Sequence, residues 1–367
     1  MSELKIIICG DISVTPESEE PFKKGDAEGA FGSICKLFKT ADRTLVNLEC
    51  AVTEHETGIK KIGPCLKGPV NTVLTLKNAG VTDCMLSNNH IFDFGKKGLY
   101  DTISELEKNE LGYTGIGDNY DDSRKNLVIE EKGIKISVIN VCEHEFSYAT
   151  DNRIGARPFD EFETMDDIRK AKAVSDYVIV VYHGGKEYCR YPSPRLLKAC
   201  REMARCGANA VLCQHSHIIG TYECFEGTHI LYGQGNFSFV EEAEGIDYNE
   251  GLLAEFTVSK ETGISVEFIP VSAKNGGIDF ASPERSREIL SDMAKRNAEI
   301  LNGRWRERWH TFCESKRRVY EAVRRGDISP ECSDPKQMFS HYLDCEAHRD
   351  VWQELFKTWN YTNELET

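Results

Sequence analysis

Short apolar runs alternate with longer amphipathic segments from the N-terminus to about residue 215. The apolar runs predict strands at Lys5–Cys9, Thr44–Leu48, Asp83–Ser87, Lys125–Glu130, Ile134–Cys142, Tyr177–Tyr182 and Ala210–Cys213. Between them, helical spacing of apolar residues predicts helices at Phe31–Lys39, Val70–Ala79, Gly95–Lys108, Glu161–Ala173 and Pro194–Cys206. Strands that alternate with helices indicate βαβ units and an α/β fold.

The pattern changes after Gln214, where glycine-containing turns separate short apolar segments. These segments predict hairpin-like strands at Thr221–Phe225, Thr228–Tyr232, Gly251–Val258 and Ser265–Pro270. A mixed sheet, or two sheets in a sandwich flanked by helices, fits this order better than a purely parallel sheet.

Strand patterns disappear from Ser282 onward. A helical run opens at Pro283 and continues through Arg325, and further helices are expected at Pro335–Leu343 and Ala347–Thr358. We therefore divide the chain into a main domain, residues 1–281, and a helical C-terminal extension, residues 282–367. The extension contains all four tryptophans, which we expect to pack as core residues: Trp305, Trp309, Trp352 and Trp359.

Composition narrows the class of protein. Hydrophobic residues make up 40% and charged residues 29%, which is ordinary for a folded chain. The 45 Lys and Arg residues against 60 Asp and Glu give a formal charge of −15. An acidic chain repels phosphate backbones and anionic lipid, so nucleic-acid binding is not expected.

The 14 cysteines raise the question of disulfides or a zinc site. No Cys-x-x-Cys pair occurs, and Cys9, Cys84, Cys142 and Cys213 lie in apolar runs where a free thiol packs as a small hydrophobe. The sequence therefore predicts neither disulfides nor a thiolate zinc site. Free thiols and an N-terminal apolar run too short for a signal or membrane anchor predict a cytoplasmic protein, with the oligomeric state left open.

Polar residues of the metal-ligand type follow the predicted strands at five places. They are Asp11, Glu49, Asn89, His183, and the pair His215 and His217. Because the carboxyl ends of strands in an α/β sheet converge on one crevice, these groups are expected to form one site. Carboxylate, amide and imidazole ligands suit one or two divalent transition metals, Mn, Zn or Fe.

Each piece has a plain structural alternative. Gly-Asp after a strand is often a turn, and a single histidine is often a satisfied core or surface residue. The coincidence of all five favours the metal site. On an extended segment, His215 and His217 would present both rings on one face. His90, next to Asn89, is placed to act as general acid, with Asp93 orienting it.

The ordered motifs resemble the CapA family of capsule and poly-γ-glutamate synthesis proteins. They are Gly-Asp, Asn-Leu-Glu, Asn-Asn-His, His-Gly-Gly-x-Glu-Tyr, His-x-His and Tyr-Gly-x-Gly-Asn-Phe, spread over residues 5–239. That family resembles, more distantly, the calcineurin-like metallophosphoesterases. The resemblance implies a four-layer αββα sandwich, here followed by the helical extension.

The metallophosphoesterase resemblance also implies roles for single residues. Asp11 and His217 match ligands of the first metal, and Glu49 stands at the position of the bridging carboxylate. The match makes Asn89 a metal ligand, His90 the catalytic histidine, and His183 and His215 ligands of the second metal. Ser13 replaces a usual histidine, Gln214 a glycine, and Gly184 a tryptophan, whose loss is expected to open the pocket. Because Ser13 removes a strong ligand of the first metal, binding of one ion and binding of two ions remain alternatives.

Three further residues are predicted to bind substrate: Lys67, Glu187 and Asn236. Glu187 is alternatively expected to orient His183. The leading hypothesis is a metal-dependent hydrolase in capsule or poly-γ-glutamate metabolism, in which a metal-activated water attacks a carbonyl or phosphoryl centre of an anionic polymer or a small molecule. The alternative is a non-catalytic protein that binds a polyanion or assists a capsule synthase.

Overall fold

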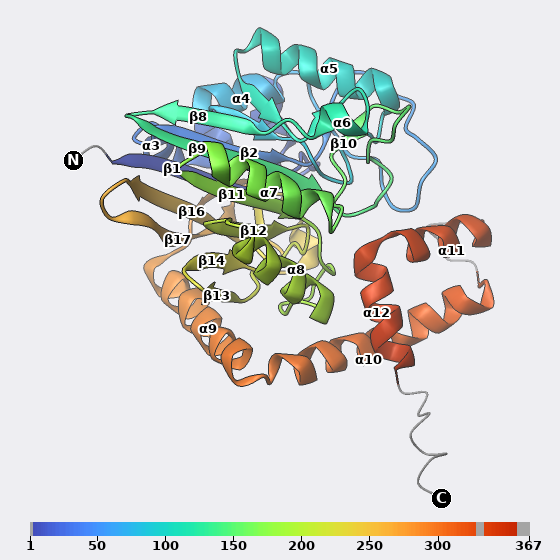
Figure 1. The fold of residues 1–367 in the computed structure, drawn as a ribbon. Coiled ribbons are helices and arrows are strands. Elements are labelled where there is room, and N and C mark those ends of the chain that lie inside the picture. Colours follow the sequence, from blue (N-terminus) through green and yellow to red (C-terminus); the bar gives the residue numbers. More distant parts are fainter. Residues whose placement is uncertain (1–2, 328–333, 358–367) are drawn as a thin grey trace, which may run out of the picture.

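The computed structural model describes residues 3–327 and 334–357, and two facing β-sheets form its centre (Figure 1). The larger sheet has eight strands in the order β18-β17-β16-β1-β2-β5-β6, with β15 paired to β1. Its members are β1 (Leu4–Ile12), β2 (Arg43–Leu48), β5 (Asp83–Met85), β6 (Gly112–Thr114), β15 (Asn236–Ser238), β16 (Glu250–Ser259), β17 (Gly263–Lys274) and β18 (Gly277–Phe280).

The smaller sheet has six strands in the order β13-β14-β12-β11-β9-β8. They are β8 (Leu127–Glu131), β9 (Ile134–Cys142), β11 (Tyr177–His183), β12 (Ala210–Gln214), β13 (Tyr222–Phe225) and β14 (Thr228–Leu231). Two small ribbons pair β3 (Ala51–Val52) with β4 (Lys67–Gly68) and β7 (Ile116–Gly117) with β10 (Gly155–Ala156).

Alternation along β1 explains the layering. Ile6 and Ile8 pack between the two sheets, against residues such as Val138 and Val181. Ile7 and Cys9 point to the opposite face and pack against the helices that cover the larger sheet. Because successive strand residues face opposite sides, a run buried on both faces specifies a strand between two apolar layers.

Helices close both outer faces of the sandwich. The larger sheet is covered by α1 (Glu19–Lys24), α2 (Ala27–Phe31), α3 (Ile34–Phe38), α4 (Thr72–Ala79) and α5 (Gly95–Lys108). The smaller sheet is covered by α7 (Glu163–Val174) and α8 (Pro194–Arg205), while α6 (Tyr120–Ser123) and the 3₁₀ helix η1 (Glu242–Glu244) lie in connections. The predicted α/β sandwich of four layers is thus confirmed.

The C-terminal helices leave the sandwich and fold back beside it (Figure 1, orange to red). They are α9 (Pro283–Asn302), α10 (Trp305–Arg325), α11 (Pro335–Asp344) and α12 (Glu346–Phe356). α9 contacts β13 and β17, and α10 packs with α11 and α12. Trp305 and Trp309 are buried as expected, whereas Trp359 lies outside the described residues. Within residues 3–327 and 334–357, no helix combines the length and apolarity needed to cross a membrane.

Three predicted elements differ clearly from the structure. The helical run expected from Pro283 through Arg325 is divided into α9 and α10 at Gly303, which has φ +84°. The single helix expected at Phe31–Lys39 is split between α2 and α3 at Gly32, which has φ +48° and lies so close to Asp279 that a Cβ would be 2.8 Å from its carboxyl carbon. The strand expected to reach Ser87 ends at Met85, because Ser87 bonds instead to Asn140 Oδ1 and Arg157 O.

Candidate metal centre

Five chain segments meet at the carboxyl edge of both sheets, as the strand-end pattern predicted. Asp11 lies at the end of β1, Glu49 directly follows β2, and His183 is the last residue of β11. Asn89 comes from the turn after β5, and His215 and His217 come from the turn after β12. These ends coincide in space because β1, β2 and β5 run parallel in one sheet and β11 and β12 run parallel in the other.

Asp11, Glu49 and His183 form the first group of possible ligands, with one donor atom of each within 4.8 Å of the others. Asp11 is fully buried, and its carboxylate accepts hydrogen bonds from Asn47 Nδ2 at 2.7 Å and from the backbone N–H of His215 at 2.9 Å. His183 Nε2 lies 3.0 Å from Asn89 Oδ1 and 3.3 Å from Glu49 Oε1. Asn89 therefore borders the same space.

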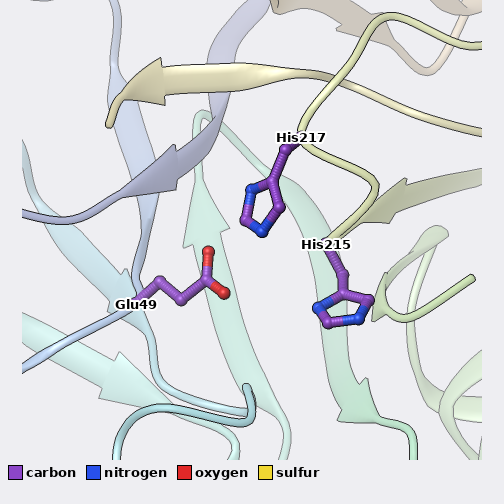
Figure 2. Close-up of side chains that lie close together, drawn as sticks. All are labelled: Glu49, His215 and His217. Atoms are coloured by element: carbon purple, nitrogen blue, oxygen red, sulfur yellow. The ribbon is translucent and has the colours of Figure 1, made fainter. Parts of the chain in front are cut away.

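Glu49, His215 and His217 form the second group, also within 4.8 Å of one another, and Figure 2 shows the carboxylate pointing toward both imidazoles. The His-Ser-His segment is not extended, and this differs from the expectation from the sequence. His215 and His217 have φ values of +76° and +58°, so the segment turns sharply. His217 Nδ1 is 3.0 Å from Asn236 Oδ1, which fixes its ring.

The donor set fits a divalent transition metal. Both carboxylate oxygens of Glu49 are buried without a well-formed hydrogen bond, and His215 Nδ1 is also buried and unpartnered within the described residues. Glu49 has an ion-pair contact with His183 Nε2 at 3.3 Å but no well-formed hydrogen bond among the described residues, and a buried carboxylate in this condition favours a bound cation. Both groups offer oxygen and imidazole donors, and Glu49 belongs to each of them. Its carboxylate is therefore placed either to bridge two ions or to bind a single ion.

The protons of the site respond to the clustered carboxylates. Burial disfavours a charged His183, but Glu49 and Asp11 outweigh burial and raise its pKa to about 10. Burial likewise opposes ionisation of Asp11, yet His183 and His217 lower its pKa to about 2. Burial dominates at His215 and lowers its pKa, although Glu145 acts in the opposite direction. The carboxylates thus attract positive charge to the centre of the site.

His90 and Asp93 lie together in the connection between β5 and α5 that also contains Asn89. His90 Nδ1 is 2.6 Å from Asp93 Oδ2, while Lys61 Nζ donates to Asp93 Oδ1 at 2.6 Å. Lys61 Nζ is also 3.0 Å from His90 Nδ1. Because a carboxylate only accepts, the 2.6 Å contact assigns a proton to Nδ1, which donates it to Asp93, so Lys61 makes no hydrogen bond to Nδ1. The second ring nitrogen of His90 is then left for proton transfer.

The three predicted substrate-binding residues have different surroundings. Glu187 pairs with Lys186 at 3.0 Å, and its pKa is well below the usual range because Lys186, with help from His215 and His217, outweighs burial. Asn236 contacts His217. The ammonium of Lys67 pairs with Glu56 at 2.8 Å, and none of its contacts among the described residues is with a candidate metal ligand.

Sequence reasoning did not assign two side chains that touch the candidate ligands. Asn47 Nδ2 lies 3.0 Å from His183 Nδ1 in addition to its bond to Asp11. Glu145 Oε2 accepts a hydrogen bond from Asn89 Nδ2 at 2.8 Å. The strand-end rule itself provides the missed signal, because Glu145 follows β9 as closely as Asn89 follows β5.

The positions that depart from metallophosphoesterases are all buried. Ser13 Oγ has no hydrogen-bond partner among the described residues, and Gln214 Nε2 donates to Cys9 O and Gln234 Oε1. Gly184 does not open the pocket as expected. A Cβ at this position would lie 2.5 Å from Glu143 Cγ and 2.6 Å from Tyr182 Cε1, so these side chains occupy that space.

Comparison with known proteins places this site in a family context. Residues 5–241 match the family model of the bacterial capsule synthesis protein PGA_cap. The chain is 28% identical over 249 residues to the capsule biosynthesis protein CapA of Bacillus anthracis, covering 65% of this chain and 60% of that protein. It is 30% identical over 243 residues to the PGA biosynthesis protein CapA of Bacillus subtilis (strain 168), covering 64% of this chain and 63% of that protein. The chain thus spans less than two thirds of the length of these two relatives.

Two more distant similarities were found. A "Probable polyglutamine synthesis accessory protein" of Mycobacterium tuberculosis (strain ATCC 25618 / H37Rv) is 26% identical over 262 residues, 66% of this chain and 68% of that protein. Among solved structures, a putative 5'-nucleotidase from Staphylococcus aureus has a TM-score of 0.47 and 13% identity, and covers 80% of this chain and 58% of that chain. That structural similarity is too low to bear on function.

Proposed function

This chain belongs to the bacterial capsule synthesis family PGA_cap, and from that premise we propose that it is a metal-dependent hydrolase acting on a capsule-related or poly-γ-glutamate-type substrate. One observation carries the proposal. Among the described residues, the buried carboxylate of Glu49 has no well-formed hydrogen bond, yet it lies within 4.8 Å of donor atoms of Asp11 and His183 in one group and of His215 and His217 in the other.

Six residues would hold the metal: Asp11, Glu49, Asn89, His183, His215 and His217. When bound, one or two Mn, Zn or Fe ions supply Lewis-acid activation of water and neutralise charge that develops at a carbonyl or phosphoryl centre. Asn47 and Asn236 hold the rings of His183 and His217 in place from outside the ligand set.

The chain's own side chains carry the proton transfer. His90 donates a proton to the leaving group, and Asp93 keeps the imidazole oriented by accepting from Nδ1. Lys61 balances the charge of Asp93. Glu187 and Lys186 form an ion pair at the edge of the site, where the 38% exposed side chain of Glu187 is available to substrate.

The test begins with protein purified without chelators and then loaded with Mn²⁺ or Zn²⁺. We expect at least one ion per chain, and hydrolysis of one class among a phosphodiester, a phosphomonoester and γ-glutamyl peptides. The His90→Ala variant should retain its metal but lose about 10² to 10⁴-fold in kcat. His55→Ala, at an exposed position, is the matched control and should keep full activity. Full activity in His90→Ala would exclude this residue as the acid.

A second function has support from the relatives in Mycobacterium tuberculosis, which are described as accessory proteins. In that case the site binds a polyanion or assists a capsule synthase without cleaving a bond. A metal-loaded protein that is inert on all three substrate classes, but binds poly-γ-glutamate in a manner lost with Lys186→Ala, would favour this function over hydrolysis.

A further inference from the structure

A second group of metal-type side chains lies where α11 and α12 meet the segment after β9. Cys345 occupies the junction of the two helices, and His348 lies in the first turn of α12. One donor atom each of Glu145, Cys345 and His348 lies within 4.8 Å of the others, and all three residues are buried. A thiol, an imidazole and a carboxylate that converge in this way match the donor types that zinc prefers.

Neighbouring contacts orient the donors. The Tyr320 hydroxyl is 2.8 Å from His348 Nδ1, so Nε2 remains for a ligand while Tyr320 fixes the tautomer. His341, at the end of α11, brings a fourth donor, with Nε2 3.6 Å from Glu145 Oε1 and its ring centroid 4.9 Å from that of His348. The spacing His-x₃-Cys-x₂-His therefore places three donors around one helix junction.

Among the described residues, no lysine forms an ion pair with Glu145, although Lys186 is near enough to help lower the pKa of its carboxyl against burial. Lys186 directs its ammonium to Glu187 at 3.0 Å, while Glu145 is faced by the imidazoles of His341 at 3.6 Å and His215 at 3.9 Å. A cation at the second group would satisfy this carboxylate, whose other oxygen is bonded to Asn89 Nδ2.

We propose that Glu145, Cys345, His348 and His341 form a zinc site that fastens the C-terminal helices to the edge of the candidate metal centre. Its role is structural, because four protein donors leave no open position. The site differs in chemistry from the first centre, whose six candidate ligands include no thiolate. Its existence does not depend on whether the first centre is catalytic.

Cobalt gives a direct test, because only a thiolate ligand produces a sulfur-to-Co²⁺ charge-transfer band. We expect the full-length protein, stripped of metal and reloaded with Co²⁺, to show this band. Cys345→Ser should abolish it. Cys313→Ser, which removes another buried thiol, and Glu49→Gln, which damages only the first centre, should keep it. No band in the unaltered protein, or an undiminished band in Cys345→Ser, would overturn the proposal.

Zinc analysis provides a second measurement. Cys345→Ser and His348→Ala should each bind one zinc fewer per chain than Cys313→Ser. If those variants do not fold, X-ray absorption of the unaltered zinc protein should show a sulfur neighbour at about 2.3 Å. A zinc protein with only nitrogen and oxygen neighbours would contradict the site, even if the first centre is fully loaded and active.

Discussion

Lys61 and Asp93 form a buried ion pair beside His90, with side chains that are 1% and 0% exposed. We predict that Lys61→Met destabilises the protein by about 3–5 kcal/mol, because the buried carboxylate of Asp93 would keep the Leu66 N–H and His90 as its hydrogen-bond partners but lose its lysine counter-charge. Denaturant unfolding at neutral pH measures the change.

Lys67 supplies the matched control for this prediction. Its partner Glu56 is 85% exposed, so water replaces the lost contact and Lys67→Met should leave stability nearly unchanged. Equal unfolding midpoints for the two variants would show that removal of Lys61 does not leave a costly buried charge on Asp93.

The proton on His183 leads to a prediction about metal binding. Because Glu49 and Asp11 outweigh burial and raise the pKa of His183 to about 10, we expect its ring to carry a proton on both nitrogens at pH 7.5 without metal, and a bound divalent ion to release about one proton. Calorimetry of Mn²⁺ binding in buffers of different ionisation enthalpy counts the protons.

Binding of Mn²⁺ without release of a proton would mean that His183 is already neutral in the metal-free protein. A neutral His183, whose Nδ1 accepts from Asn47 Nδ2 at 3.0 Å, could shift its remaining proton without net release. Heats that do not depend on the buffer would therefore contradict the prediction. Affinity that rises between pH 6 and 9 would support it independently, since protons then compete with the ion.

At the scale of elements, the sequence predicts a helix or strand correctly where the pattern of apolar residues is long and regular. The expected helix Gly95–Lys108 and strand Ile134–Cys142 have the observed bounds. The helix at Phe31–Lys39 failed because Gly32 is constrained by Asp279, far away along the chain. A pattern of apolar residues contains no information about such a contact.

The candidate site shows the same limit. Strand ends could be read one by one, so the six metal-ligand candidates were found and the structure brings them together. Their ligand role stays a prediction. The neighbours of Glu145 were not found, because His341, Cys345 and His348 come from helices that follow no strand and reach the site only through the folding back of the extension.

Docking of α12 against the main domain should depend on pH. His144 Nδ1 lies 2.6 Å from Glu346 Oε1, and its backbone N–H donates to Glu346 Oε2 at 2.8 Å. Burial opposes the charge on both side chains, yet each partner outweighs it, so the pKa of His144 is raised and that of Glu346 is lowered.

The sign of the effect follows from these directions. A histidine whose pKa is raised by folding adds to the free energy of unfolding. This stabilisation is complete below the pKa of the unfolded state, about 6.5, and is lost as the pH rises through the pKa of the folded state. Glu346 contributes above about 4.5 and loses its contribution on acidification. We predict that His144→Gln costs about 1 kcal/mol near pH 6 and less at pH 9. A constant difference across this range, or an equal one in the exposed control His55→Gln, would contradict the prediction.

For the whole molecule, the candidate metal centre lies where the carboxyl edges of the two sheets meet. Asp11, Glu49 and Asn89 come from the edge of the larger sheet, and His183, His215 and His217 come from the edge of the smaller one. A bound ion would therefore connect both halves of the sandwich, and unfolding of either half would destroy the site. Such an ion binds only the folded chain and stabilises it by mass action.

We predict that Mn²⁺ at about 100 times its dissociation constant stabilises the protein by about 2.7 kcal/mol, and that a chelator reverses this. Mn²⁺ is chosen because it favours oxygen and imidazole ligands over the thiolate of Cys345. Denaturant unfolding with and without Mn²⁺ measures the difference. Glu49→Gln should reduce it sharply, since both ligand groups share this carboxylate, whereas Glu284→Gln, at the exposed start of α9, should not. Stabilisation that persists in Glu49→Gln would mean that Mn²⁺ binds elsewhere and that the two sheets are not joined through this site.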